Sequence, residues 1–268
     1  MSLRITQNIE ALNATRNLQG TSAKITKSME KLSSGYRINR AADDAAGLGI
    51  SESMRSQIRG IAQGQRNIQD GVSMVQTAEG NLDEVHSMLQ RVRELAVQYK
   101  NGSLDTAARN SIQNEVDQLA SEISRIGAQA QFNGLPLLTG NTTVSFQVGA
   151  NDGEQISITM LDLANSVGTS YSTLTATGAS DISEIDAAIN AVSVARGEMG
   201  AVQNRLEHTL SLQASYQENL TAAESRIRDV DMAEEMVNLT KTQVLQQAGT
   251  AMLAQANQQP QTVLRLLQ

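Results

Sequence analysis

The stretch IRGIAQGQRNIQDGVSMVQTAEGNLDEVHSMLQRVRELAVQY, which runs from Ile58 to Tyr99, decides the fold. Its apolar residues recur at gaps of three and four almost throughout, which places them on one face of a helix. The pattern predicts one coiled-coil-like helix from about Ala45 to Lys100, whose apolar face needs partner helices. The residues of this face are Ile58, Ile61, Ile68, Val72, Val75, Ala78, Leu82, Val85, Leu89, Val92, Ala96 and Tyr99.

A shorter helix is expected to follow and to fold back on the first. Asn101-Gly102 interrupts the pattern, because glycine often follows the last turn of a helix, and Ser103 or Asp105 is suited to cap a new one. The sequence therefore predicts two antiparallel helices joined by a short turn. The apolar positions of the second are Ile112, Val116, Leu119, Ile123, Ile126 and Ala130.

The pattern changes to a period of two in the middle of the chain. Apolar and polar residues alternate on both sides of the turn sequence Asn151-Asp152-Gly153, which predicts one β-hairpin. Phe132-Asn133-Gly134 is typical of a turn, and residues 162–180, rich in Ser, Thr and Gly, are expected to form a loop. The alternating apolar positions are Val144, Phe146, Val148, Ile156, Ile158 and Met160.

A second long helical pattern occupies the second half of the chain. Its face comprises Ile185, Ile189, Val192, Ala195, Met199, Val202, Leu206, Thr209, Leu212, Tyr216, Leu220, Ala223, Ile227 and Val230. Two such faces can bury each other, so the sequence predicts a mainly α fold. Long antiparallel coiled-coil-like helices from both halves of the chain are expected to pack as a rod, with a small β-hairpin region.

Both ends of the chain are amphipathic and carry few charges. A helical face runs from Ile5 to Leu32 and is broken at Ser33-Ser34-Gly35, while residues 242–264 contain no charged side chain and Pro260 is expected to close that segment. One interpretation is a pair of disordered tails, because isolated helices of this kind are marginal in water. The other is two helices that become ordered when they pack against each other and against copies from other chains. The low charge favours the second interpretation.

The composition excludes several classes of function. The chain has 268 residues, of which 40% are hydrophobic, but no Cys, no Trp and only 2 Phe. Few aromatics suit thin seams between helices better than a compact enzyme core. A net charge of −7 argues against nucleic acid as a main partner. The absence of Cys excludes disulfides and thiolate chemistry, and no apolar run suggests membrane insertion or a cleaved signal peptide.

The sequence offers no constellation for catalysis. His86 and His208 each stand alone on a helical pattern, and no HExxH, GxSxG, P-loop or dinucleotide motif occurs. We therefore expect no catalytic residue, no cofactor and no metal site. The adjacent pair Asp43-Asp44 invites a metal-site hypothesis, but neighbouring carboxylates diverge by about 100° on a helix. A helix cap or an ion pair is the favoured interpretation.

One further pair could contact another protein. Arg91 and Leu95 lie four positions apart and so share a face of the long helix, while Val92 and Ala96 hold its apolar seam. A leucine beside an arginine on an outward face is a candidate protein contact. The alternative is a solvated face with one stray leucine, and spacing alone favours that alternative.

Several long motifs, in order and spread over nearly the whole chain, resemble those of bacterial flagellin. Small departures are Tyr36 and Arg40, where Leu and Ser are common in the family, and Gln268, where Arg is common. The motifs are ALNATRNL (Ala11–Leu18), LSSGYRINRAADDAAGLGIS (Leu32–Ser51), QRVRELAVQ (Gln90–Gln98), QFNG (Gln131–Gly134), SRIRDVDMAEEM (Ser225–Met236) and VLQQAGTAMLAQANQQPQTVL (Val244–Leu264).

The resemblance implies a short flagellin without large central outer domains, a structural subunit of the bacterial flagellar filament. Residues 1–44 and 229–268 would form the inner filament-core domain, and residues 45–180 and 181–228 the rod domain. Inter-subunit contacts or the joint between domains would involve Arg37, Arg40, Asp43 and Asp44. Filament-core packing would involve Ile5, Ile9, Leu12, Leu18, Val244, Met252, Leu253, Val263 and Leu264.

The resemblance also implies partners. The chain would be exported unfolded through the flagellar type III channel, with a chaperone at its C-terminal segment, and would meet filament cap and junction proteins outside the cell. Toll-like receptor 5 would recognise it through Arg91, Leu95 and Glu115. The competing hypotheses are a hook–filament junction protein, an enzyme of unknown activity and a soluble helical adaptor.

Overall fold

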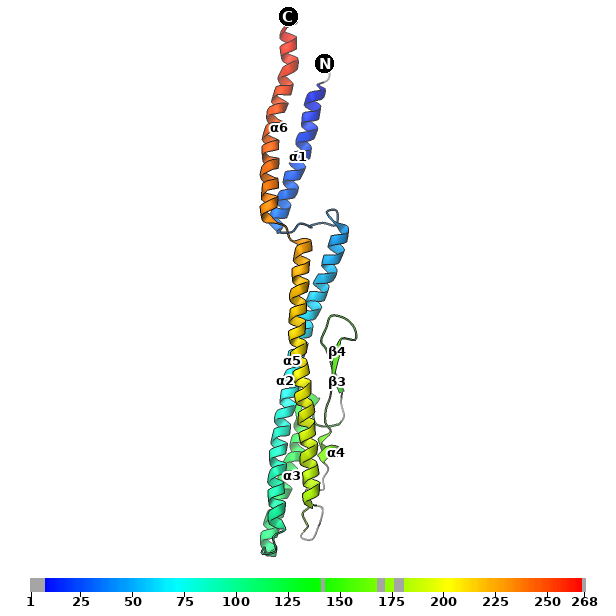
Figure 1. The fold of residues 1–268 in the computed structure, drawn as a ribbon, viewed down its shortest axis with the longest axis vertical. Helices are drawn as coiled ribbons and strands as arrows, with labels where there is room; N and C mark the ends of the chain where they lie inside the picture. The colour runs from blue at the N-terminus through cyan, green and yellow to red at the C-terminus, as the bar shows by residue number, and fades with distance from the viewer. Residues whose placement is uncertain (1–7, 141–142, 168–171, 176–180, 267–268) are drawn as a thin grey trace. The chain divides into compact units, whose positions relative to one another are not determined.

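The computed structural model describes residues 8–140, 143–167, 172–175 and 181–266, with residues 166 and 259–266 described by their backbone alone (Figure 1). Helices dominate, and the prediction of a mainly α fold with long helices packed against one another is confirmed. The elements are α1 (Ile9–Ser34), α2 (Ala45–Tyr99), α3 (Thr106–Gln129), β1 (Gln131–Phe132), β2 (Leu135–Pro136), β3 (Thr143–Gln147), β4 (Gln155–Thr159), α4 (Leu163–Val167), α5 (Asp181–Arg228) and α6 (Met232–Leu266).

The chain divides into two compact units. The terminal unit contains Met1–Arg55 and Asn219–Gln268, and the central unit contains Ser56–Glu218. Helices α2 and α5 each contribute a part to both units. In the terminal unit, α1 and α6 lie side by side (Figure 1). In the central unit, α2, α3 and α5 run along one another (Figure 1) and share one hydrophobic core.

The apolar seam of α2 forms the core of the central unit, as the sequence predicts. Val75, Leu82, Leu89 and Val92 are fully buried against apolar residues of α3, α5 and the hairpin formed by β3 and β4. The predicted bounds of α2 are correct to within one residue. Asp105 is the residue that caps α3, since its side chain accepts a hydrogen bond from the amide of Ala108 at 2.8 Å.

Among the residues that the structure describes there are two hairpins, whereas the sequence pattern predicts one. The expected hairpin is present as β3 and β4, paired from Thr143 with Thr159 to Gln147 with Gln155. The additional hairpin pairs β1 with β2 across Asn133 and Gly134. Both turn residues have positive φ, 49° and 79°, which Asn and Gly adopt at little cost.

The expectation that residues 162–180 form a loop is corrected in part. Asp162 accepts a hydrogen bond from the amide of Asn165 and caps the short helix α4.

The expected apolar face of α5 is buried over only part of its length. It does not continue as a buried seam past Leu206, because Leu212 and Tyr216 are 67% and 52% exposed. At this part of α5 the helix lies beside α2 but no longer beside α3 (Figure 1), so fewer of its positions are covered.

Helix α6 also continues through Pro260 to Leu266, instead of closing at the proline. A proline inside a helix removes the hydrogen bond to the carbonyl four residues earlier, here that of Ala256. That carbonyl has a substitute donor, because the side-chain amide of Asn8 donates to it at 2.8 Å.

Glycines of α2 allow the β3–β4 hairpin and the turn after β3 to pack closely against the helix. A Cβ atom at Gly60 would lie 2.8 Å from the Ala150 Cβ, and one at Gly64 would lie 2.5 Å from the Val148 carbonyl oxygen. Asn67 adds a hydrogen bond from its side-chain amide to the Gln147 carbonyl at 2.9 Å. Backbone thus approaches backbone here, and a side chain would separate them.

Gly64→Ala is expected to destabilise the central unit. The added methyl group must displace the backbone of Val148, so we expect the free energy of unfolding to fall by about 1–3 kcal/mol. The matched control is Gly80→Ala on the same helix, where nothing lies within 4 Å of the new Cβ. That substitution should raise stability by about 0.5–1 kcal/mol. Urea unfolding followed by circular dichroism measures the free energy of unfolding of both variants. Equal effects of the two substitutions would contradict the close packing of the hairpin against Gly64.

Candidate assembly surface and connector of the terminal unit

The paired helices α1 and α6 contact each other through both apolar and polar side chains. A Cβ atom at Gly249 would lie 3.0 Å from the Leu18 Cδ1, so the glycine lets the leucine approach the helix backbone. Glu235 accepts a hydrogen bond from the Ser28 hydroxyl at 2.5 Å and pairs with the Lys31 ammonium at 3.5 Å. Ser28, Leu239 and Ala256 are buried in this pair.

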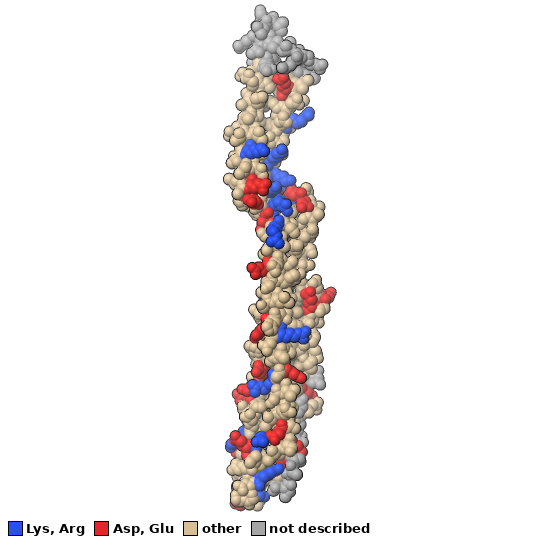
Figure 2. All heavy atoms as spheres, viewed as in Figure 1, with Lys and Arg blue, Asp and Glu red and all other residues tan. Residues whose placement is uncertain are grey.

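Much of the apolar surface of the pair remains uncovered within the chain. Each of these side chains is about half exposed or more and is therefore available for contact with another protein. On the visible face of these helices, charged side chains lie mainly toward one end (Figure 2). We call this set the terminal apolar face: Ile9, Leu12, Met29, Met232, Met236, Val237, Val244, Leu245 and Met252.

The residues predicted to pack in the filament core divide into three groups. Ile9, Leu12, Val244 and Met252 belong to the terminal apolar face. Leu18 and Leu253 are half-buried. Ile5 lies outside the described residues, and Val263 and Leu264 lie on α6 in its backbone-only part. Their packing between subunits stays a prediction.

The terminal unit has two connectors, residues 35–44 between α1 and α2 and residues 229–231 between α5 and α6. These two connectors pair with each other. Helix α1 ends at Gly35, whose φ of 75° is left-handed and whose amide donates to the Lys31 carbonyl at 2.8 Å. Tyr36 then forms an antiparallel β-bridge with Asp229, on the segment between α5 and α6. The amide of Arg37 donates to the Arg228 carbonyl at 2.7 Å. Segments from opposite ends of the chain are thereby joined by backbone hydrogen bonds.

Two arginines reinforce this bridge. Arg37 donates through its guanidinium to the Ile227 carbonyl at 2.6 Å, which satisfies a carbonyl at the end of α5. Arg228 lies with its guanidinium carbon 5.0 Å from the centre of the Tyr36 ring, and it pairs with Glu52 at 2.5 Å. Tyr36, one of the departures from the expected motif, therefore supplies a cation–π partner.

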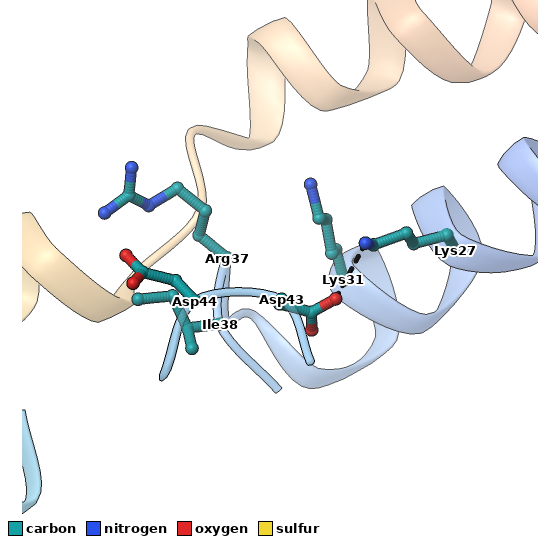
Figure 3. A pocket seen from close by; sticks show the side chains of 6 residues that line it. All are labelled: Lys27, Lys31, Arg37, Ile38, Asp43 and Asp44. Atoms are coloured by element: carbon teal, nitrogen blue, oxygen red, sulfur yellow. Dashed lines mark ion pairs between the residues drawn. The ribbon is translucent and has the colours of Figure 1, made fainter. Parts of the chain in front are cut away.

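The carboxylates of Asp43 and Asp44 have separate partners and do not converge (Figure 3). Asp44 accepts a hydrogen bond from the Gly47 amide at 2.8 Å, at the start of α2. Asp43 pairs with the Lys27 ammonium at 2.7 Å, while Arg40, the other departure, pairs with Glu30 at 2.9 Å. Among the described residues, no group of three His, Cys, Asp or Glu side chains could hold a metal ion.

These side chains border a small open pocket of about 250 Å³ (Figure 3). Its wall includes Ile38, which is only 2% exposed and which sequence reasoning overlooked. A Cβ atom at Gly47 would lie 2.8 Å from the Ile38 Cδ1, so Ile38 anchors the connector against the start of α2. Its only sequence signal is a lone apolar residue in a polar segment. The pocket is lined by Lys27, Lys31, Arg37, Ile38, Asp43 and Asp44.

The Lys27–Asp43 pair should be visible in a titration. The hydrogen bond from Lys27 is the main cause that lowers the pKa of Asp43 from 3.8 to about 2. A lowered carboxyl pKa stabilises the fold above pH 3.8, and this contribution is lost as the pH falls through about 2. In Lys27→Met we expect the pKa of Asp43 to rise towards 3.8 in an NMR titration. An unchanged pKa would contradict the pair.

The predicted receptor patch of the central unit is only partly exposed. Arg91 on α2 donates to Glu115 on α3 at 2.9 Å and to Glu94 at 3.0 Å. The hydrogen bond to Glu115 is the main cause that raises the pKa of Arg91. The interpretation of Leu95 as an outward leucine is wrong, because it is 2% exposed and packs in the core. Helix α2 packs against both α3 and α5, so its buried face must be wider than the strip formed by Val92 and Ala96, and Leu95 lies within it.

No helix among the described residues is both long and apolar enough to cross a membrane.

Comparison with known proteins identifies the family. The model of the bacterial flagellin N-terminal helical region matches residues 5–143, and that of the C-terminal helical region matches residues 182–267. A flagellin of Halalkalibacterium halodurans is 53% identical, with 98% of this chain and 99% of that protein covered. The flagellar filament 33 kDa core protein of Treponema phagedenis is 46% identical, with coverages of 98% and 99%.

A solved structure agrees with these matches. The crystal structure of Bacillus cereus flagellin is 29% identical and superposes with a TM-score of 0.51, covering 59% of this chain and 94% of that chain. Two family models that together span most of the chain, and relatives aligned over nearly its whole length, lead to one conclusion. The chain belongs to the bacterial flagellin family.

Proposed function

We propose that this chain is the structural subunit of a bacterial flagellar filament and polymerises with copies of itself. The observation that carries the proposal is the terminal apolar face, which a single chain leaves uncovered on both α1 and α6. The residues of this face lie on both α1 and α6, so more than one neighbouring subunit can cover them. Contacts that do not close on themselves produce a helical polymer. The role is structural and involves no catalysis.

The domain assignment follows from the same proposal. Residues 1–44 and 229–268 form the inner core of the filament, and residues 45–228 form the rod outside it. The connector residues Arg37, Arg40, Asp43 and Asp44 hold the packing register where these parts join. Ion pairs of Asp43 with Lys27 and of Arg40 with Glu30 support this role.

Export and location complete the proposal. The chain leaves the cell unfolded through the flagellar type III channel, accompanied by a chaperone bound to its C-terminal segment. It then folds at the filament tip in the presence of cap and junction proteins and remains in the extracellular appendage. Support comes from the sparse charge and the uncovered apolar residues of the terminal helices, which need partners to be stable in water.

Electron microscopy of the purified full chain, added to short filament seeds, tests the function. We expect the seeds to elongate into long filaments, with growth that depends on the concentration of the chain. A chain lacking residues 229–268 serves as the control and should not elongate seeds. If the full chain binds seed ends but never elongates them, a hook–filament junction role replaces the filament role.

Recognition by Toll-like receptor 5 is part of the proposal and involves the exposed pair Arg91 and Glu115. Leu95 acts beneath this pair by packing, and it does not touch the receptor. We expect Arg91→Asp to reduce signalling in a receptor reporter assay by more than about tenfold, since it reverses a charge at the contact. The matched control is Arg125→Asp, which breaks an exposed pair with Glu122 on α3. Equal signalling by both variants would contradict the assignment.

A further inference from the structure

Pro260 removes one backbone hydrogen bond from the interior of α6. In an α-helix, each backbone amide donates to the carbonyl four residues earlier, and proline has no amide hydrogen. The carbonyl of Ala256 therefore lacks the amide donor that an α-helix normally provides four residues later, although the helix continues to Leu266. Ala256 is only 9% exposed, so its surroundings give water little access. A buried carbonyl without a partner opposes folding.

Asn8, at the other end of the chain, provides the missing donor. Its side-chain Nδ2 donates to the Ala256 carbonyl at 2.8 Å. The Oδ1 of the same side chain accepts from the Ala11 amide at 3.0 Å and caps α1. One carboxamide thus satisfies two helices at positions where their own backbones have no partner. Asp or Ser could cap α1 equally well, but a carboxylate has no donor and a serine is shorter.

The position of this contact matters for the pairing of α1 with α6. At the opposite end of the pair, Glu235 binds Ser28 and Lys31. Between the two ends, the contact of Leu18 with Gly249 is apolar and sets no register by hydrogen bonding. Carbonyls in the interior of α6 are engaged by the helix itself, whereas the proline leaves that of Ala256 available.

We infer that Asn8 determines the register of the terminal helices. It does so by donating a hydrogen bond to the Ala256 carbonyl, which Pro260 leaves without its usual amide donor. This inference rests on the proposed filament function, because the register decides which residues of α1 and α6 lie together on the terminal apolar face. A slipped pair would present a different face to neighbouring subunits. Asn8 is thus a positioning residue for assembly.

A double-mutant cycle tests the inference with the full chain. The proteins are wild type, Asn8→Asp, Pro260→Ala and the double variant, and the readout is the critical concentration for elongation of filament seeds. Asn8→Asp keeps the cap but loses the donor, so we expect a critical concentration about fivefold higher than that of wild type. Pro260→Ala gives residue 260 an amide that can bind the Ala256 carbonyl. In that background, Asn8→Asp should change the value less than about twofold.

Two additional measurements separate the possible outcomes. Asn8→Ser repeats the cycle without a new charge and should give the same pattern. A carbon-13 label at the Ala256 carbonyl allows its stretching band to be followed in infrared spectra. Compared with wild type, this band should lie at higher frequency in Asn8→Asp but not in the double variant, whether or not filaments grow. An effect of equal size in both backgrounds, or no effect in either, would overturn the role of Asn8. Failure of the wild type to elongate seeds would overturn the filament function instead.

Discussion

Replacing Val244 and Met252 together by glutamate is expected to abolish filament growth while the central unit stays folded. Both side chains are uncovered in the single chain, with exposed fractions of 63% and 66%, so the charges cost little there. In the proposed filament the same positions would lie against neighbours, where two buried charges without partners would each cost several kcal/mol. The critical concentration should therefore rise by more than about a hundredfold, beyond the range of a seeded assay.

The matched control keeps the same positions apolar. Val244→Leu with Met252→Leu should elongate seeds at close to the wild-type critical concentration, because transfer of leucine from water remains favourable. Thermal unfolding of the central unit should be alike in all three proteins. Filaments of normal length and yield from the glutamate variant would remove the terminal apolar face from the proposed assembly mechanism.

Leu95→Ala is expected to lower the free energy of unfolding of the central unit by about 2–5 kcal/mol, since it opens a cavity in the core beside Val92 and Ala96. Val97→Ala, two residues further along α2, is the control. Val97 is 52% exposed, and its loss should change stability by less than about 0.5 kcal/mol. Denaturant unfolding measures both values.

This prediction also determines how receptor experiments should be interpreted. If Leu95 acts by packing, the signalling of Leu95→Ala should follow the fraction of folded protein as temperature is varied. Arg91→Asp should lose signalling at every temperature, because it changes the contact itself. A Leu95 variant that is fully stable yet silent would show that Leu95 touches the receptor directly.

Long elements could be predicted from the sequence, because many residues report on the same helical face. The bounds of α2 and the cap at Asp105 are examples. Short elements could not: β1 and β2 have two residues each, too few for a period, and only Asn133-Gly134 marks their turn. Helix α4 is likewise a single turn within a polar segment.

The remaining differences come from contacts between distant parts of the chain. Spacing shows that Leu95 is near the seam of α2, but the number of helices around that seam decides whether it is buried. The bridge between Tyr36 and Asp229 uses backbone groups, which leave no trace in side-chain pattern. Pro260 suggests a helix end in the sequence, whereas in the structure the carbonyl that it leaves without an amide donor is bound by Asn8, from the other end of the chain.

The uncharged segment of α6 has a consequence for how a filament would respond to its medium. Attraction between ions weakens as salt screens it, whereas burial of apolar surface is strengthened by ions such as sulfate that are excluded from protein surfaces. Residues 242–258 carry no ionic group that could be screened. A filament held together by this segment would keep its cohesion from fresh water to brine, and sulfate would promote its growth.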